Sequence, residues 1–247
     1  MSDELWEPAH AVPELRAGEV HVWCDATSHA APWTADGYLT ADERAQSGRM
    51  SSLERRATFV RARSCLRFLA GRYLKVVPGD VPIRILEKGK PVITSTADAP
   101  PLAVSVAHSG STILVAFTRV GEVGVDVERI DSGVDRASIA RRFFTAAEAS
   151  ALAALTPPDS LSCFFALWAH KEAMLKAAGD GLSMPLAEVE FAIEAGRPPM
   201  LLRVPAAFGS AIEWSVRALE AGLQMAGAVA VRGQVGSVRH LRWQAPG

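Results

Sequence analysis

The sequence predicts a mixed α/β (α+β) fold, and three observations favour this class. Short apolar or β-branched runs, such as residues 113–117 and 225–231, are typical of strands, and they occur between longer helical stretches. Hydrophobic residues make up 49% of the chain and charged residues 21%, which is typical of a globular protein. The length of 247 residues suits one large domain or two small ones.

The predicted elements follow the chain in two similar series. The first half is expected to hold strands at residues 20–23, 81–86, 102–106 and 113–117. Its long helix spans about residues 40–74, with a break near 47–48 or 51–52, and Pro78-Gly79 ends it. The second half is expected to hold a strand at 124–128 and helices at 134–143, 146–155 and 161–178, followed by strands at 189–193, 200–204, 212–216 and 225–231.

Charge and composition exclude several classes of function. The net charge of −1 argues against a nucleic-acid binder that works by bulk electrostatics. Residues 1–7 are acidic and lack the basic-then-apolar pattern of a secretory signal, and the longest apolar stretches are too short to span a bilayer. Cys24, Cys65 and Cys163 are few and widely spaced, which favours a reducing cytoplasm over a disulfide framework or a zinc site. We therefore expect a cytoplasmic protein with no membrane or nucleic-acid partner.

Two short stretches carry most of the functional information. Residues 124–128 read as a strand, so Asp126 and Glu128 leave it on the same face. Residues 168–176 read as a helix on which Trp168, Glu172 and Lys176 stack at i, i+4 spacing. If strand and helix meet, their carboxylates and ammonium groups converge, and such a cluster can hold a divalent cation together with a phosphate.

Each of these residues also has a purely structural interpretation. Asp126 and Glu128 could form a solvated strand face, and Glu172 with Lys176 could be an ordinary helical ion pair. The apolar neighbours of both stretches favour function, because charged groups at the edge of a core need partners. Trp168 is expected to pack rather than to touch a substrate.

Taken together, five motifs resemble those of the 4'-phosphopantetheinyl transferases, in particular the larger monomeric Sfp type. The motifs lie between residues 40 and 190 and are Gly89-Lys90-Pro91, Ala107-His108-Ser109-Gly110, Gly124-Val125-Asp126-Val127-Glu128, Arg142-Phe143-Phe144-Thr145 with Glu148, and Trp168-x-x-Lys171-Glu172-Ala173-x-x-Lys176. The resemblance implies two similar α/β halves in a pseudo-twofold arrangement with coenzyme A between them. A boundary near residues 119–121 would give halves of 1–120 and 121–247, with nucleotide binding and part of the carrier surface in the first and the magnesium and phosphate site in the second.

The resemblance also implies an activity and its partners. Enzymes of this family transfer 4'-phosphopantetheine from coenzyme A to a serine of an apo acyl or peptidyl carrier protein and release 3',5'-ADP. Magnesium, or manganese in its place, is expected at Asp126, Glu128 and Glu172. Glu172 is the favoured base for the carrier serine and Glu128 the alternative, because a carboxylate on the metal is a poorer base. The alternative to an enzyme is a non-catalytic module that binds the carrier protein or coenzyme A and retains the fold.

The remaining expected contacts are to the phosphates and the nucleotide of coenzyme A. The resemblance places Lys171 and Lys176 toward the phosphates, and Lys90, Pro91 and His108 in the nucleotide pocket. The family's serine before the histidine is Ala107 here, so one hydroxyl contact is absent, and the backbone of the following turn could compensate for it.

A basic segment and one further glutamate complete the candidates. Residues 40–75 hold nine basic residues against three acidic ones, a local charge of +6. This segment is either a solvated helix face or a basic surface for an anionic ligand or an acidic partner. The family's usual arginine is Thr58 in this chain, so Arg56 and Arg63 are the candidates for the 3'-phosphate. Glu148 either completes a capping box with Thr145 or lies near the metal.

Overall fold

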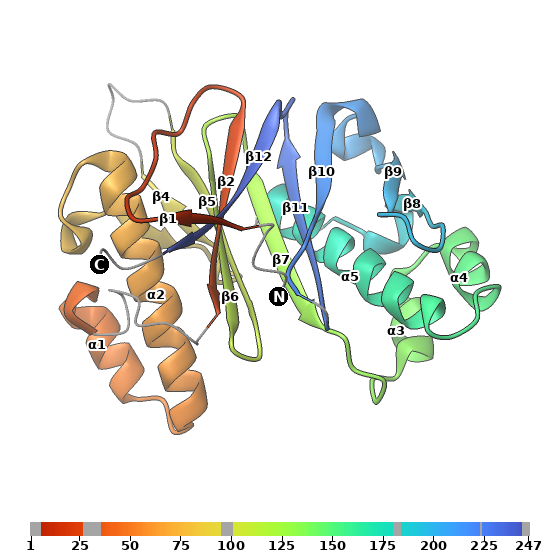
Figure 1. The fold of residues 1–247 in the computed structure, drawn as a ribbon, viewed down its shortest axis with the longest axis horizontal. Helices are drawn as coiled ribbons and strands as arrows, with labels where there is room; N and C mark the ends of the chain where they lie inside the picture. Colours follow the sequence, from red (N-terminus) through yellow and green to blue (C-terminus); the bar gives the residue numbers. More distant parts are fainter. Residues whose placement is uncertain (1–5, 27–35, 95–100, 180–183, 223, 244–247) are drawn as a thin grey trace.

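The computed structural model describes residues 6–26, 36–94, 101–179, 184–222 and 224–243. Two β-sheets lie at the centre and helices flank them on both sides (Figure 1). The flanking helices are α1 (Ala41–Gly48) and α2 (Leu53–Leu74) on one side, and α3 (Arg136–Phe143), α4 (Ala146–Ala153) and α5 (Asp159–Ala178) on the other. This arrangement confirms the mixed α/β class. None of the helices within these ranges is long and apolar enough to cross a membrane.

The larger sheet has five strands in the order β1-β12-β2-β6-β5. Its strands are β1 (Glu7–Ala9), β2 (Glu19–Ala26), β5 (Ala103–Ser109), β6 (Thr112–Thr118) and β12 (Ser237–Trp243). β12 pairs in parallel with both β1 and β2, whereas β2, β6 and β5 pair antiparallel. The expected division at residues 120/121 assigned β12 to the second half, but this strand is hydrogen-bonded into the sheet of the first half.

The smaller sheet has three antiparallel strands in the order β10-β11-β7. These strands are β7 (Val123–Arg129), β10 (Trp214–Leu219) and β11 (Met225–Arg232). Two hairpins stand apart from both sheets, namely β3 (Ile83–Ile85) with β4 (Pro91–Ile93), and β8 (Glu190–Ala192) with β9 (Met200–Arg203). Single 3-10 turns occur at Asp36–Tyr38, Pro78–Asp80, Leu186–Glu188, Ala206–Phe208 and Ala211–Glu213.

The break expected in the long helix of the first half is confirmed. α1 ends at Gly48, and α2 begins after Ser52, whose hydroxyl accepts a hydrogen bond from the backbone N–H of Arg55. A serine that caps a helix in this way satisfies one of its unpaired N–H groups. α2 ends at Leu74, and the next residue, Lys75, caps it in the left-handed conformation with φ 58°.

An apolar layer joins the two sheets. It draws Val22 from β2, Leu114 from β6, Val125 from β7 and Val229 from β11 into one buried cluster. All four side chains are at most 1% exposed, so burying them excludes water between the halves. The other faces of the two sheets pack against α2 and α5, respectively.

β7 and α5 approach each other closely, and Gly124 permits this approach. A Cβ atom on Gly124 would lie 1.9 Å from the carbonyl oxygen of Ala173 and 2.4 Å from the backbone nitrogen of Ala177. Both atoms belong to the backbone of α5, so they cannot rotate away as a side chain can. Glycine therefore sets the short distance between the strand and the helix that carry the candidate site.

Candidate active site

Two carboxylates of β7 point toward α5. The side chain of Asp126 is buried, and that of Glu128, near the end of the strand, is half-buried. Successive side chains of a strand leave it on opposite faces, so Val125 and Val127 lie in the apolar layer between the sheets instead. The face that Asp126 and Glu128 share is therefore the one that meets the helix.

Lys176 of α5 binds directly to the strand. Its Nζ lies 2.7 Å from Oδ1 of Asp126 and donates a hydrogen bond to the carbonyl oxygen of Val125 at 3.1 Å. Glu172, one helical turn earlier, is half-buried on the same side of α5. The i, i+4 spacing of Glu172 and Lys176 thus brings a carboxylate and an ammonium group to the acidic strand.

Trp168 supports Glu128 from the preceding turn of α5. Its indole Nε1 donates a hydrogen bond to Oε1 of Glu128 at 3.1 Å. The ring also packs edge-on against Phe143, with 5.3 Å between the ring centroids. Trp168 therefore packs as expected and, in addition, orients one of the two carboxylates of β7.

The cluster holds more negative charge than Lys176 can neutralise. Burial, followed by the charges of Asp126 and Glu128, raises the pKa of Glu172 to about 7, while Lys176 opposes the shift. Burial also raises the pKa of Asp126 and of Glu128. Within the described residues, Oδ2 of Asp126 is buried without a hydrogen-bond partner. A buried carboxylate oxygen that lacks a hydrogen-bond partner favours the binding of a second cation next to it.

These carboxylates do not form a complete metal cage by themselves. In the part of the chain that the structure describes, no three His, Cys, Asp or Glu side chains are arranged as a ready ligand set. Magnesium commonly takes one or two protein carboxylates and completes its shell with water and substrate phosphates. The free oxygen of Asp126, with Glu128 and Glu172 nearby, fits this mode of binding.

Lys171 does not face this cluster, and the prediction that it points toward the phosphates is wrong. Its side chain is completely buried, and its Nζ lies 2.8 Å from Oε2 of Glu148. The same ammonium group donates to the carbonyl oxygens of Leu186 at 2.7 Å and Val189 at 2.6 Å. Neighbouring residues of a helix point about 100° apart, so Lys171 enters the core while Glu172 faces the site.

Glu148 has the structural role that its capping box predicts. Its carboxylate accepts hydrogen bonds from the backbone N–H groups of Thr145 at 2.7 Å and Phe191 at 2.9 Å, besides the ion pair with Lys171. It is 1% exposed. All of its near partners are thus protein groups of the core, and the alternative position next to the metal is not the one that it occupies.

A hollow of about 510 Å³ extends from the cluster to the β3–β4 hairpin. Residues from both halves line it, namely Lys88, Gly89, Lys90, Pro91, Ser105, Val106, Glu172, Leu175, Lys176 and Gly179. Nζ of Lys90 donates to the carbonyl oxygen of Lys176 at 2.7 Å and pairs with Glu122 at 3.0 Å. Lys90 and Pro91 therefore lie at the same hollow as Glu172 and Lys176, as a shared substrate would require.

His108 is exposed near the end of β5 and interacts electrostatically with the cluster. Partial burial and the charge of Lys176 lower its pKa, whereas Asp126 raises it. Ala107 lies on the opposite face of the strand, buried in the apolar layer between the sheets. An alanine suits that position, because a hydroxyl there would need a partner among apolar side chains.

The two arginines predicted to read a phosphate lie in different surroundings. Arg56 is exposed near the start of α2. Arg63 lies 3.5 Å from the carboxylate of Glu43, and its guanidinium stacks over the ring of Phe59 at 5.7 Å. The charge of Arg63 is therefore already engaged within the first half.

Arg61 was not among the predicted residues, yet it contacts the turn next to His108. It pairs with Asp25 of β2 at 2.8 Å and donates to the carbonyl oxygen of Ser111 at 3.3 Å. Nothing in the local sequence distinguishes Arg61 from the other arginines of α2, because both of its partners are distant along the chain.

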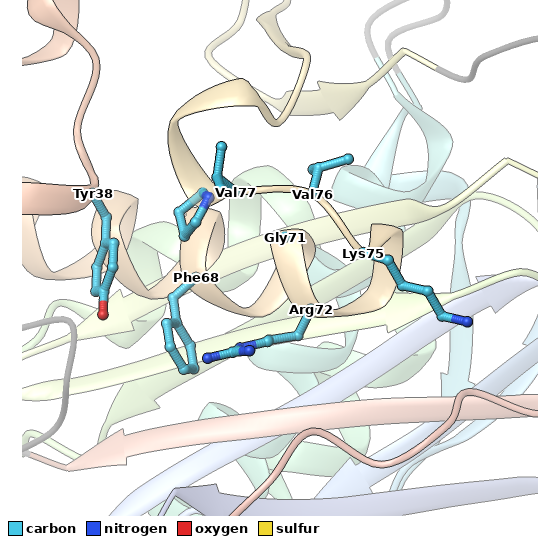
Figure 2. Close-up of a pocket in the computed structure, with 8 residues that line it drawn as sticks. Tyr38, Phe68, Gly71, Arg72, Lys75, Val76 and Val77 are labelled. Carbon is cyan, nitrogen blue, oxygen red and sulfur yellow. The ribbon is translucent and has the colours of Figure 1, made fainter.

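The basic segment does not form one continuous surface. A second hollow, of about 510 Å³, lies at the C-terminal end of α2. Figure 2 shows that Arg72 lies beside Phe68 there, near Tyr38. The guanidinium of Arg72 is 5.2 Å from the ring centroid of Phe68. The residues that line this hollow include Lys75 but no carboxylate, so they offer no acidic ligand for a metal. Arg72 and Lys75 thus belong to a different region of the molecule from the carboxylates of β7.

Comparisons with known proteins agree with the site. A sequence model of the 4'-phosphopantetheinyl transferase superfamily matches residues 122–229, which include β7 and α5. The 4'-phosphopantetheinyl transferase HetI from a Nostoc species is 32% identical over 235 residues, covering 94% of this chain and 96% of HetI. Sfp from Bacillus subtilis is 32% identical over 121 residues (49% of this chain, 51% of Sfp), and AcpT from Salmonella typhimurium is 36% identical over 93 residues (38% and 47%).

Glu172, a half-buried carboxyl group with a raised pKa, lies at a hollow that both halves of the molecule line. Such a group in a cleft is typical of an enzyme active site. The similarity to HetI extends over nearly the whole chain, so it indicates which class of enzyme this is. The chain belongs to the 4'-phosphopantetheinyl transferase superfamily.

Proposed function

We propose that this chain transfers the 4'-phosphopantetheine group of coenzyme A to a serine of an acyl or peptidyl carrier protein and releases 3',5'-ADP. The observation that supports this most directly is the hollow between the halves. Glu172 and Lys176 line it from the second half, where Lys176 pairs with Asp126, and Lys90 and Pro91 line it from the first half. A ligand with a pyrophosphate and a nucleotide can contact residues of both halves in this hollow.

Asp126, Glu128 and Glu172 are the residues that would hold Mg²⁺, or Mn²⁺ in its place. Their donor atoms are all carboxylate oxygens, which these hard cations prefer. When bound, the cation would neutralise and orient the charge of the pyrophosphate. Lys176 would then share Asp126 with the cation, because only Oδ1 of that carboxylate is taken by the ammonium group.

Glu172 is the proposed base. In the transfer, the serine hydroxyl oxygen forms a bond to the phosphorus on the pantetheine side, the bond from this phosphorus to the bridging oxygen breaks, and 3',5'-ADP departs with that electron pair. The serine proton needs an acceptor within about 2.6–3.2 Å or through one water. With a pKa near 7, Glu172 can accept this proton at neutral pH, provided that it does not ligate the metal at that moment. Glu128, with a pKa that is also raised, is the second choice.

The first half supplies the proposed nucleotide contacts. His108 reaches the cluster electrostatically, and Lys90 with Pro91 lines the common hollow. Arg61, rather than Arg63, lies next to the turn that follows His108. Exposed Arg56 remains a candidate for the 3'-phosphate or for the carrier surface.

The proposal is tested by incubating the protein with coenzyme A, Mg²⁺ and an apo carrier protein, and by following the intact mass of the carrier. The carrier should gain one phosphopantetheine group at its serine. Glu172→Gln keeps the shape of the side chain but removes its charge, so transfer should fall at least about 100-fold. Glu194→Gln is the matched control, because Glu194 is exposed and pairs with the likewise exposed Arg197, so its rate should equal that of the wild type.

One outcome would contradict the proposed transfer, and another would contradict only the proposed role of Glu172. Binding of coenzyme A without transfer to any of several carriers would favour a non-catalytic binding module. Transfer by Glu172→Gln at the wild-type rate would show that Glu172 is not the base. The membership of the chain in the superfamily would not be affected.

A further inference from the structure

The two sheets meet at their edge strands. β5 is the last strand of the five-stranded sheet, and β7 is the last strand of the three-stranded one. No backbone hydrogen bond joins these two strands in the described chain, so the N–H groups on the open edge of β7 need other acceptors. The way in which they are satisfied determines how the two halves are aligned.

Two serine hydroxyls of β5 serve as these acceptors. Oγ of Ser105 accepts a hydrogen bond from the backbone N–H of Val125 at 3.0 Å, and Oγ of Ser109 accepts one from Arg129, also at 3.0 Å. The partners are four residues apart on both strands and run in the same direction. Four residues of a strand extend about 13 Å, so the two bonds fix both the separation and the register of the strands.

These bonds bracket the candidate site. Asp126 and Glu128 lie on β7 between Val125 and Arg129. Ser109 directly follows His108 and precedes Gly110, whose φ of 56° makes the turn. The bond from Arg129 to Ser109 therefore ties the His108 turn to the end of the strand that carries the carboxylates.

Burial makes the first bond hard to replace with water. Ser105 is 2% exposed and Val125 is fully buried. The carbonyl oxygen of Val125 accepts from Lys176, so both polar backbone groups of this residue are held by the surrounding side chains. A substitution at Ser105 would therefore shift the backbone of Val125, and with it the position of Lys176 relative to Asp126.

We propose that Ser105 and Ser109 are positioning residues that hold the His108 turn at a fixed distance from Asp126 and Glu128. This inference rests on the proposed function to the extent that coenzyme A spans the two halves. Each serine acts through a backbone N–H of β7, and Ser105 in addition lines the hollow proposed for coenzyme A. Misplacing catalytic groups by about 1 Å can cost on the order of 100-fold in rate, so two hydroxyls can matter this much.

The direct test measures hydrogen exchange of individual backbone amides by NMR in Ser105→Ala, Ser109→Ala and the double variant. The amide of Val125 should exchange faster in the first variant and that of Arg129 in the second. A lost hydrogen bond of this kind corresponds to roughly two- to tenfold faster exchange. Ser109→Thr keeps the hydroxyl and should restore the protection of Arg129.

The kinetic test uses the full-length enzyme with coenzyme A, Mg²⁺ and an apo carrier protein. The double variant should lose at least about tenfold in kcat/KM for coenzyme A, while the KM for the carrier protein stays unchanged. The matched control is Ser215→Ala, because the hydroxyl of Ser215 accepts from the backbone N–H of Val235 at 3.1 Å and donates to Gly233. Ser215 lies on β10, at the opposite edge of the same sheet from β7. It should lose comparable stability and keep its kinetic constants.

The possible outcomes separate this inference from the proposed function. Unchanged amide exchange in the serine variants would overturn the inference, whatever the activity. Faster exchange with unchanged kcat and KM would also overturn it, because the bonds would then be structural only. A wild-type protein that transfers nothing would refute the proposed function, and the exchange data would still report on the alignment of the strands.

Discussion

Replacing Lys171 by Met should be among the most damaging single changes in this protein. The ammonium group of Lys171 is fully buried and has three acceptors within 2.8 Å, namely Glu148 and the carbonyl oxygens of Leu186 and Val189. Burial lowers the pKa of this lysine, and the Glu148 carboxylate opposes the shift. Met fills a similar volume but offers none of the three hydrogen bonds.

The magnitude follows from what remains after the change. The Glu148 carboxylate stays buried with two backbone N–H donors and no cation, and two carbonyl oxygens lose their donor. Removing one partner of a buried ion pair typically costs about 3–5 kcal/mol. Proteins are usually stable by only about 5–15 kcal/mol, so this change removes a large share of the free energy of unfolding. Adding Glu148→Gln should recover part of the loss, because the amide oxygen can still accept while the unpaired charge disappears.

Urea unfolding, followed by circular dichroism, measures these differences for the single and the double variant. Arg197→Met is the control, since Arg197 forms an exposed pair with Glu194 and should change stability by less than about 1 kcal/mol. A loss below about 1 kcal/mol in Lys171→Met would mean that water reaches the pair, and the reasoning from burial would fail. A double variant that loses at least as much as Lys171→Met alone would show that the unpaired charge is not the cause.

Three further predictions concern packing, pH and metal. Gly124→Ala should destabilise the fold by about 3 kcal/mol in the same urea assay, because the new Cβ atom would collide with the backbone of α5. Gly79→Ala is the control and should be nearly neutral, because a Cβ atom at Gly79 meets nothing within 4 Å. Burial lowers the pKa of His170 to about 4, so the unfolded chain binds its proton first, and stability is lost as the pH falls from about 6.5 toward 4. Between pH 7.5 and 4.5 this contribution amounts to about 2–3 kcal/mol, and His170→Leu should remove that part of the pH dependence of unfolding. Transfer activity should vanish in EDTA and return with Mg²⁺ or Mn²⁺, and undiminished turnover in chelated buffer would exclude the proposed role of Asp126.

The local geometry of the site could be predicted because it depends on short spacings. Asp126 and Glu128 share a face since they are two residues apart in a strand. Trp168, Glu172 and Lys176 share a side of α5 since they are four residues apart in a helix. The contact between Lys176 and Asp126 in the structure agrees with that geometry, whereas the catalytic roles of these residues stay predictions.

The partners of buried charges could not be predicted in the same way. Lys171 and Glu148 are 23 positions apart on different helices, and no periodic pattern links them. The prediction treated Lys171 like its neighbour Glu172, although adjacent helical residues point in different directions. The apolar surroundings of Lys171 in the sequence already indicated a buried position, but not which acid would neutralise it.

Long-range strand pairing could not be predicted from the sequence either. β12 lies between β1 and β2, although more than 200 residues separate Glu7 of β1 from Leu241 of β12. Neither β1 nor β12 was predicted, because parallel pairing between the ends of a chain leaves no local signal such as a hairpin turn. The first half of the fold is therefore completed by the last described strand.

The position of the site follows from the same arrangement of strands. β7 ends one sheet next to the end of another, and an open edge exposes polar backbone groups that must find partners. Serine hydroxyls of β5 accept hydrogen bonds from N–H groups of this edge, and Lys176 donates one to the carbonyl oxygen of Val125. A continuous backbone ladder between β5 and β7 would have left no place for these side chains. Because no backbone ladder joins β5 and β7 in the described chain, Lys176 of α5 can reach Asp126 and the open edge of β7. The carboxylates therefore lie where the two halves meet.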